Sequence, residues 1–177
     1  MSTPAQLQAV ARQALACLDL TSLNDGQDLA GGEADIDALC AKANGKFGPT
    51  AAVCVWPRLA ARARAQLPAH IRVAAVANFP DGSSDVQRAV RDTAAIVDAG
   101  AQEVDVVMPY RDLAAAPAVL WAVRRACEGL TLKVILETGE AATCHAHLYP
   151  FVKSRHKQRT GSPQPMTDDA HARRIHP

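Results

Sequence analysis

The sequence lacks the features that would place it in a membrane or outside the cell. Its longest apolar runs fall far short of the roughly 20 residues that a membrane-spanning helix needs. Residues 1–15 (MSTPAQLQAVARQAL) contain neither a long apolar core nor the cleavage pattern of a signal peptide. These absences predict a cytoplasmic protein that does not bind membranes.

Binding of nucleic acid or nucleotides also finds no support in the sequence. The net charge is only +1 and aromatic residues make up 4% of the chain, so an electrostatically driven nucleic-acid partner is not indicated. Neither G-x-G-x-x-G nor G-x-x-x-x-G-K-[ST] follows any apolar run. With 49% apolar residues in 177, the chain can bury one sizeable core.

Cysteine is scarce and its spacing is loose. The chain has an odd number of cysteines, five, without the paired spacing of a disulfide framework. We expect reduced thiols, most of them buried, and no cofactor or metal. The cluster Cys144, His145 and His147 leaves one alternative open, a metal site, although structural zinc wants four ligands.

The character of the sequence changes after Glu140. Residues 1–140 hold 13 Lys and Arg against 16 Asp and Glu, whereas residues 141–177 hold 6 against 2, with five of the six histidines. Apolar runs alternate with helical patterns before this point, and no sustained period follows it. We predict that residues 1–140 form one folded part and residues 141–177 a basic, His-rich, disordered tail.

Five short apolar runs punctuate residues 1–140. They are rich in Val and Ile and lack clean polar alternation, as in strands covered by helices. The runs read ACLDLT, TAAVCVWP, IRVAAVANFP, EVDVVMPY and LKVILETGE. Helical segments are predicted between them, at Asp35 to Ala43, Pro57 to Leu67, Ser84 to Ala99 and Leu113 to Cys127.

Alternating strands and helices predict an α/β fold with a parallel sheet, as an open doubly wound sheet or as a (β/α) barrel. Polar residues inside the strands favour the barrel, which has an interior for them. Since side chains alternate along a strand, Glu103 and Asp105 share a face opposite Val104 and Val106. The same alternation sends Asp19, Cys54, Asp105 and Lys133 toward one axis, with Asn78 near the end of the third run.

Such a cluster suits proton transfer at a carbon beside a carbonyl group. The alternative is a structural ion pair of Lys133 with Asp105 or Glu103, and Asp19 could also be a strand-end cap. Asp105 lies toward the C-terminal end of its strand, where barrel chemistry occurs, which favours a function for it.

Five motifs, LDLTSLN, TAAVCVWPR, IRVAAVANFPDG, GAQEVDVVMPYR and LKVILETGE, resemble successive strands of the deoxyribose-phosphate aldolases, in the order found in that family. The resemblance covers about Ala16 to Glu140. It implies a TIM barrel and a metal-independent class I aldolase that cleaves 2-deoxyribose 5-phosphate through a Schiff base on a lysine. Its partner would be this phosphorylated sugar, in deoxyribonucleotide catabolism.

The resemblance also implies roles for single residues. Asp105 resembles the family's proton-relay aspartate, Asp19 an active-site aspartate, and Cys54 a cysteine that lines the pocket. Lys133 resembles a fifth-strand lysine that binds substrate and is not the Schiff-base lysine.

The family's Schiff-base motif, like F-I-K-T-S-T-G, and its helper-lysine motif, like G-F-K-P-A-G-G, do not occur in this sequence. Lys153 stands in a superficially similar F-x-K but lacks the residues that follow. We therefore expect an incomplete barrel of about five strands, truncated or frameshifted after Glu140 and inactive by itself. The alternative function is a noncatalytic fragment that associates with itself through its open sheet edges.

Overall fold

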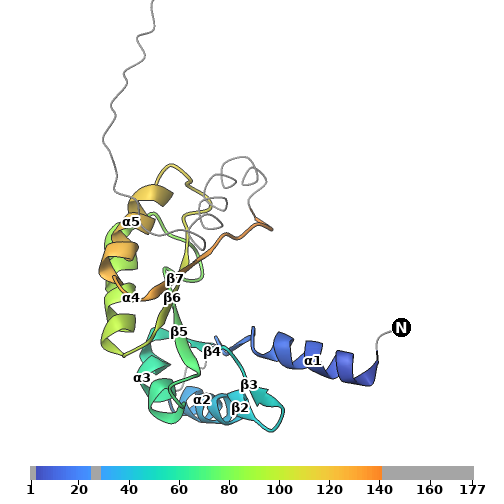
Figure 1. Cartoon of the computed structure of the whole chain (residues 1–177). Coiled ribbons are helices and arrows are strands. Elements are labelled where there is room, and N and C mark those ends of the chain that lie inside the picture. Colours follow the sequence, from blue (N-terminus) through green and yellow to red (C-terminus); the bar gives the residue numbers. More distant parts are fainter. Residues whose placement is uncertain (1–2, 25–28, 141–177) are drawn as a thin grey trace, which may run out of the picture. The chain divides into compact units, whose positions relative to one another are not determined.

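The computed structural model describes residues 3–24 and 29–140 (Figure 1). The predicted tail, including Lys153 and the cluster Cys144, His145 and His147, lies outside these ranges. The first half of the described chain contains α1 (Pro4–Leu15), β1 (Asp19–Thr21), α2 (Leu29–Ala43), β2 (Asn44–Gly45), β3 (Gly48–Pro49), β4 (Ala52–Val55) and α3 (Pro57–Gln66). The second half contains β5 (Arg72–Ala77), α4 (Val86–Asp98), β6 (Glu103–Val107), α5 (Ala116–Ala126) and β7 (Thr131–Ile135).

The five predicted strands form one sheet in the order β1-β4-β5-β6-β7, and every neighbouring pair is parallel. This confirms the α/β fold and the strand content predicted for an incomplete barrel. Helices α2 to α5 lie together on one side of the sheet (Figure 1), as right-handed crossovers require. Within the described residues, β1 and β7 each pair on one side only.

The core lies between the sheet and this helical layer. Its strand members are the apolar side chains of alternate positions, such as Val53, Val73, Val104 and Val106, all without solvent exposure. The helices contribute Ile36, Ala60, Ile96 and Val119. The predicted facing of Val104 and Val106 toward the helices is therefore confirmed.

Local signals in the sequence fix the ends of α3, α4 and α5. Asp85 caps α4 by accepting a hydrogen bond from the backbone N–H of Arg88, and the helix gives way to Gly100 at φ 74°. Pro117 lies in the first turn of α5, as predicted. By contrast, α2 begins at Leu29, six residues before the predicted start at Asp35, because glycines hid the helical pattern of that segment.

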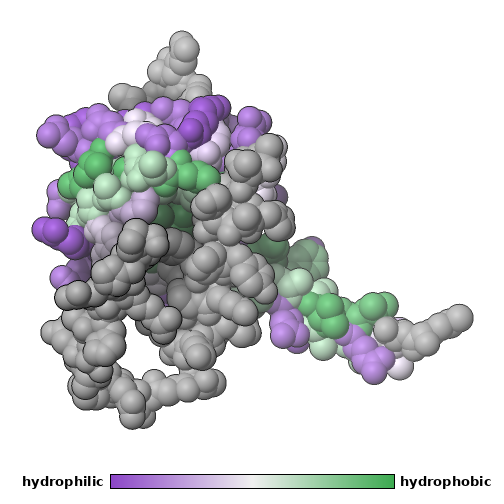
Figure 2. Space-filling model, turned by 90° about the horizontal axis from the view of Figure 1, so that it is seen from above, coloured by the Kyte–Doolittle hydropathy of each residue, from purple (hydrophilic) through white to green (hydrophobic). Residues whose placement is uncertain are grey.

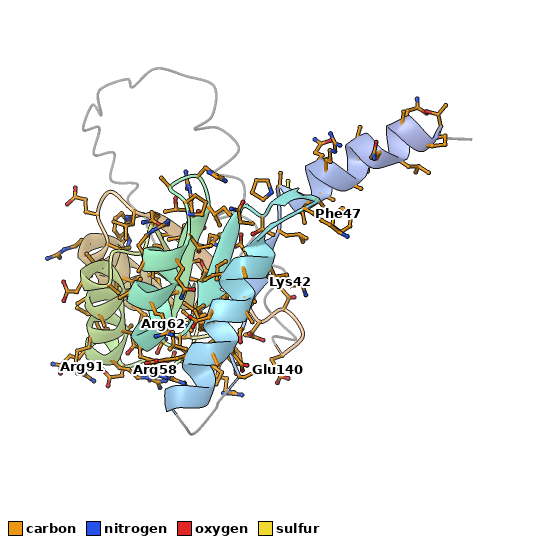
Figure 3. The ribbon with its side chains drawn as sticks, turned by 90° about the horizontal axis from the view of Figure 1, so that it is seen from below. Lys42, Phe47, Arg58, Arg62, Arg91 and Glu140 are labelled. Atoms are coloured by element: carbon orange, nitrogen blue, oxygen red, sulfur yellow. The ribbon has the colours of Figure 1, made fainter. Side chains whose placement is uncertain are left out.

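The sequence analysis missed α1 and the short β2–β3 hairpin. Thr3 and Gln6 form a capping box at the start of α1, with Pro4 in the first turn, a signal readable from the sequence. None of the twelve residues of α1 is buried, and Figure 2 shows apolar residues at its surface. Leu7 and Val10 are 59% and 63% exposed, and Phe47 in the hairpin is 75% exposed (Figure 3).

Polar contacts between helices reinforce the outer layer. Arg62 of α3 pairs with Asp37 of α2 at 2.7 Å and with Glu33 at 2.9 Å (Figure 3). These partners are partly exposed, so solvent screens the pairs. None of the helices in the described ranges is long and apolar enough to cross a membrane.

Candidate active site

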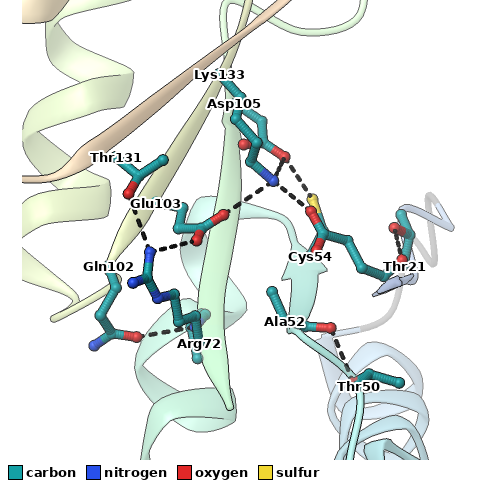
Figure 4. Close-up of polar contacts among 12 residues, drawn as sticks. Thr21, Thr50, Ala52, Cys54, Arg72, Gln102, Glu103, Asp105, Thr131 and Lys133 are labelled. Atoms are coloured by element: carbon teal, nitrogen blue, oxygen red, sulfur yellow. Dashed lines mark hydrogen bonds and ion pairs between the residues drawn. The ribbon is translucent and has the colours of Figure 1, made fainter. Parts of the chain in front are cut away.

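Four strands bring the predicted site residues to the sheet face that carries no helices. Asp105 of β6 stands directly beside Lys133 of β7 in the register, and Thr21 of β1 stands beside Cys54 of β4. Asp19 lies two residues before Thr21 and therefore on the same face. The structure thus brings together all four residues that the alternation pattern pointed toward one axis, of which Figure 4 labels Cys54, Asp105 and Lys133.

Lys133 is the centre of this cluster. Its Nζ lies 3.1 Å from Asp105 Oδ2 and 3.1 Å from Glu103 Oε2, and it also donates a hydrogen bond to Asp19 Oδ2 (Figure 4). The two β6 carboxylates are 11% and 12% exposed, whereas the side chains of Lys133 and Asp19 are 33% exposed. One ammonium group therefore serves three carboxylates, and the two ion pairs that the sequence left as alternatives form together.

The two oxygens of Asp105 have different surroundings. Oδ2 accepts from Lys133 and from the Cys54 thiol, whose Sγ lies 3.6 Å away. Oδ1 is buried and finds no hydrogen-bond partner among the described residues. A buried polar atom without a partner costs free energy. Protonation of Asp105 at Oδ1 would displace neither Lys133 nor Cys54, because both bond to Oδ2.

Burial and neighbouring charges shift the ionisation of the cluster. Burial raises the pKa of the Asp105 carboxyl, and Lys133 opposes that effect. Burial alone would lower the pKa of Lys133, but its bonds to Asp19, Asp105 and Glu103 outweigh it and raise this pKa. Burial, followed by the charge of Asp105, raises the pKa of Cys54 to about 12. The lysine therefore stays protonated and the thiol stays neutral near neutral pH, and Asp105 holds a proton more readily than an exposed aspartate does.

An apolar wall adjoins the charged cluster on the same face of the sheet. Cys54, Ala74 and Val76 form it, each at most 4% exposed, and three partly buried side chains pack against it: Leu23, Trp56 and Phe79. A wall of this kind keeps water away from a small reacting molecule. Apart from Cys54, the sequence analysis missed these residues, because nothing in a strand pattern separates a lining residue from a core residue.

Asn78 takes a different place from the one predicted. It is fully buried at φ 53°, and its Nδ2 donates to the backbone carbonyls of Ser83 and Val107. Its own N–H donates to Asp92 of α4. Asn78 therefore fastens the loop after β5 to the end of β6, and no bond joins it to Lys133 or Asp105.

Metal binding has no candidate in the part of the chain that the structure describes. No three His, Cys, Asp or Glu residues there are arranged to hold a metal ion. The groups that the described residues place in the site are carboxylates, one ammonium group and an apolar wall.

The parallel sheet has its helices on one side and the carboxylate–lysine cluster on the other, which we call the inner face. This arrangement is that of part of an aldolase barrel. The chain belongs to the DeoC/LacD family of aldolases, whose family model matches residues 13–147. Members of this family are lyases. The membership confirms the resemblance that the five strand motifs indicated.

Individual relatives agree with the family. The deoxyribose-phosphate aldolase of Agrobacterium fabrum is 45% identical to the chain over 134 residues, which are 71% of this chain and 50% of that protein. A solved structure from Coccidioides immitis, provisionally assigned as a deoxyribose-phosphate aldolase, matches 81% of this chain and 65% of its own, with 26% identity and a TM-score of 0.63. The tetrameric deoxyribose phosphate aldolase of Aeropyrum pernix matches 75% of this chain and 58% of its own at 19% identity and a TM-score of 0.54, which shows the fold alone. The chain spans about half the length of its curated relative.

Proposed function

We propose that the cluster on the inner face is the proton-transfer part of a Schiff-base aldolase site that acts on 2-deoxyribose 5-phosphate. The name of the Agrobacterium fabrum relative supports the substrate. The observation that carries the proposal is the asymmetry of Asp105, with Oδ2 held by Lys133 and Cys54 and Oδ1 buried without a partner among the described residues. The reaction would serve deoxyribonucleotide catabolism in the cytoplasm.

Each residue has a defined part in this proposal. In cleavage, Asp105 takes the proton of the C3 hydroxyl as the C2–C3 bond breaks and gives a proton to C2 of the enamine that remains, so that the carboxylate and carboxyl forms alternate. Lys133 stabilises the ionised form of Asp105, and Asp19 helps to hold the Lys133 ammonium group in place. The apolar wall with Cys54 excludes water from the aldehyde fragment, which protects a reactive enamine from side reactions.

The nucleophile does not come from the strands that the structure describes. Among the described residues, Lys133 is the only lysine on the inner face of the sheet. Three carboxylates hold it as an ammonium ion, which is a poor nucleophile. The family's Schiff-base and helper-lysine motifs do not occur in the sequence. We therefore expect this polypeptide to cleave no deoxyribose 5-phosphate by itself. Borohydride reduction in the presence of substrate should trap no covalent adduct, and an adduct on the chain would contradict this part of the proposal.

The proton-transfer part can be tested separately by supplying the missing amine. The folded chain is mixed with acetaldehyde and methylamine in D2O, where the amine forms an imine with acetaldehyde. Asp105 should then catalyse the exchange of the acetaldehyde methyl protons for deuterium. NMR should show faster deuteration than with amine alone, and Asp105→Asn should remove this gain. Asp98→Asn is the matched control, because Asp98 is an exposed residue at the end of α4. Equal exchange rates with the unmodified chain and Asp105→Asn would refute the role of Asp105.

The alternative function is that of a noncatalytic barrel fragment that associates with itself. The observation that favours it is that β1 and β7 each pair on one side only in the described sheet. Unpaired strand edges are sites of association. Light scattering after size exclusion tests the alternative: a discrete homo-oligomer supports it, and a folded monomer contradicts it.

A further inference from the structure

A second cation adjoins the charged cluster near the N-terminal ends of the strands. Arg72, the first residue of β5, donates through Nη1 to Glu103 Oε1 at 3.0 Å and to Thr131 Oγ1 at 3.2 Å (Figure 4). The other Glu103 oxygen, Oε2, accepts from Lys133 at 3.1 Å. Glu103 therefore lies between two cations, one on each oxygen, and connects Arg72 to Lys133.

We infer that Glu103 is a positioning residue for Lys133, and that Arg72 controls through Glu103 how strongly Lys133 acts on Asp105. The inference rests on the proposed proton transfer by Asp105 and adds two residues to which that proposal gives no role. It makes Arg72 a remote regulator of the proton-transfer group, although Arg72 does not touch Asp105.

The physical basis is competition for one ammonium group. Asp19, Glu103 and Asp105 all bond to Lys133 Nζ, so each carboxylate attracts the ammonium group and limits how closely it can approach the others. Arg72 gives Glu103 a second partner and so weakens the attraction of Glu103 for Lys133. When Arg72 is neutral, Glu103 depends on Lys133 alone, and the lysine stabilises ionised Asp105 less.

The groups that face Asp105 are few, so the effect can be isolated. Lys133 approaches from β7, Cys54 from β4, and Asp19 from β1 through the shared lysine. Glu103 lies on the same strand, and Arg72 reaches the cluster from β5 only through Glu103. The Arg72 side chain is 55% exposed, so its replacement opens no cavity in the core.

A purely structural role for these residues makes a different prediction. Arg72, Glu103 and Thr131 belong to three neighbouring strands, and their bonds could serve only to hold the strand ends together. In that case neutral substitutions would lower the free energy of unfolding and leave the ionisation of Asp105 unchanged.

The experiment follows the carboxyl carbon of Asp105 by NMR across a pH titration of the whole chain. Glu103→Gln removes a competing negative charge and should shift the pKa of Asp105 downward. Arg72→Gln removes the positive charge and should shift this pKa upward. Arg72→Lys keeps the charge and should leave the pKa close to that of the unmodified chain.

A double substitution tests whether Arg72 acts through Glu103. Adding Arg72→Gln to the Glu103→Gln chain should produce no further shift, because the connecting carboxylate is gone. A full upward shift in that background, or shifts of the two single variants in one direction, would overturn the inference. If Glu103→Gln does not fold, as judged from the amide spectrum, the comparison of Arg72→Gln with Arg72→Lys decides.

The titration also separates this inference from the proposed function. If Asp105 in the unmodified chain titrates like an exposed aspartate, the proposed function loses its proton-transfer group. If its pKa is raised but responds to neither substitution, only the role of Glu103 and Arg72 is refuted.

Discussion

The Cys54 thiol donates a hydrogen bond to Asp105, with Sγ 3.6 Å from Oδ2, across two strands that do not neighbour each other in the sheet. The bond spans β5, whose side chains on this face, Ala74 and Val76, are small. It connects the apolar wall to the charged cluster. Each group also controls the ionisation of the other, which allows the chemistry of Asp105 to be read from the reactivity of a sulfur atom.

The first prediction concerns this thiol. Asp105→Asn removes the negative charge that, after burial, raises the pKa of Cys54 toward about 12. The thiolate fraction at pH 9 should rise, and alkylation of Cys54 by iodoacetamide should accelerate, by about tenfold for each unit that the pKa falls. Peptide mass spectrometry measures the rate at each cysteine separately.

Cys127 is the internal control for that measurement. Burial raises the pKa of its thiol too, but the charged group that acts on it is Arg124 and not Asp105. Its alkylation rate should not change in Asp105→Asn. Equal acceleration at Cys54 and Cys127 would show that the substitution had loosened the fold, and an unchanged Cys54 rate would contradict the prediction.

The second prediction concerns stability and pH. Because burial raises the pKa of Asp105, the folded chain binds this proton more tightly than the unfolded chain does. Ionised Asp105 therefore lowers the free energy of unfolding as pH rises from the unfolded pKa, about 3.9, through the folded pKa. Asp105→Asn should raise stability by about 1 kcal/mol at pH 8, since Lys133 keeps Asp19 and Glu103 as partners.

This gain should shrink as pH falls toward 4, where protonated Asp105 and asparagine are alike in charge. Urea unfolding at several pH values measures it, with the exposed Asp98→Asn as the reference variant. A loss of stability at pH 8, or a gain that does not depend on pH, would show that Asp105 is not held at a cost to the fold.

The third prediction removes the cation at the centre of the cluster. Lys133→Met leaves three carboxylates close together without their shared partner. It should cost about 2 kcal/mol at pH 8, below the value for a fully buried pair because Lys133 is 33% exposed. The cost should be smaller at low pH, because protonation of Asp105, whose pKa is raised by burial, removes one of the three negative charges.

Lys46→Met is the matched control for charge and size. Lys46 lies over the ring of Phe47, which is itself exposed, and this contact is worth about 0.5 kcal/mol. Its replacement should change stability by no more than that at either pH. Equal costs for the two substitutions would mean that the cluster on the inner face is not a special environment for Lys133.

The fourth prediction compares two glycines with left-handed backbone. A Cβ on Gly129, at φ 87°, would meet no atom within 4 Å, so Gly129→Ala should cost only the conformational penalty of about 1–2 kcal/mol. A Cβ on Gly82, at φ 61°, would overlap the backbone carbonyl oxygen of Met108. Gly82→Ala should therefore cost more, about 3 kcal/mol or above, as thermal unfolding can show.

The sheet and its facing were predictable because each strand carries a strong local pattern. Runs such as EVDVVMPY are apolar on both faces except where a carboxylate interrupts them, and parity then assigns Asp105 and Val104 to opposite sides. The start of α2 was not predictable in the same way. Tertiary contacts of α2 with α3 and the sheet, which include Ile36 and Cys40, override the weak propensity of its glycines.

The distances between side chains in the site could not be predicted from the sequence pattern. Alternation places Lys133 and Glu103 on one face, but it cannot say that Glu103 lies within bonding distance of both Lys133 and Arg72. Strand register and side-chain length decide that. Alternation also failed for Asn78, which it placed near the end of its strand and close to the cluster. The backbone of Asn78 is left-handed and not extended, so its side chain bonds to the following loop.

The exposure of α1 has a consequence for how the chain denatures. No residue of this helix shares in the core, so its hydrogen bonds open without any loss of packing in the sheet. Amide protons of residues 4–15 should exchange with solvent far sooner than those of β5 and β6. Helicity and the fluorescence of Trp56 would then follow separate melting curves, and a single midpoint would describe only the latter.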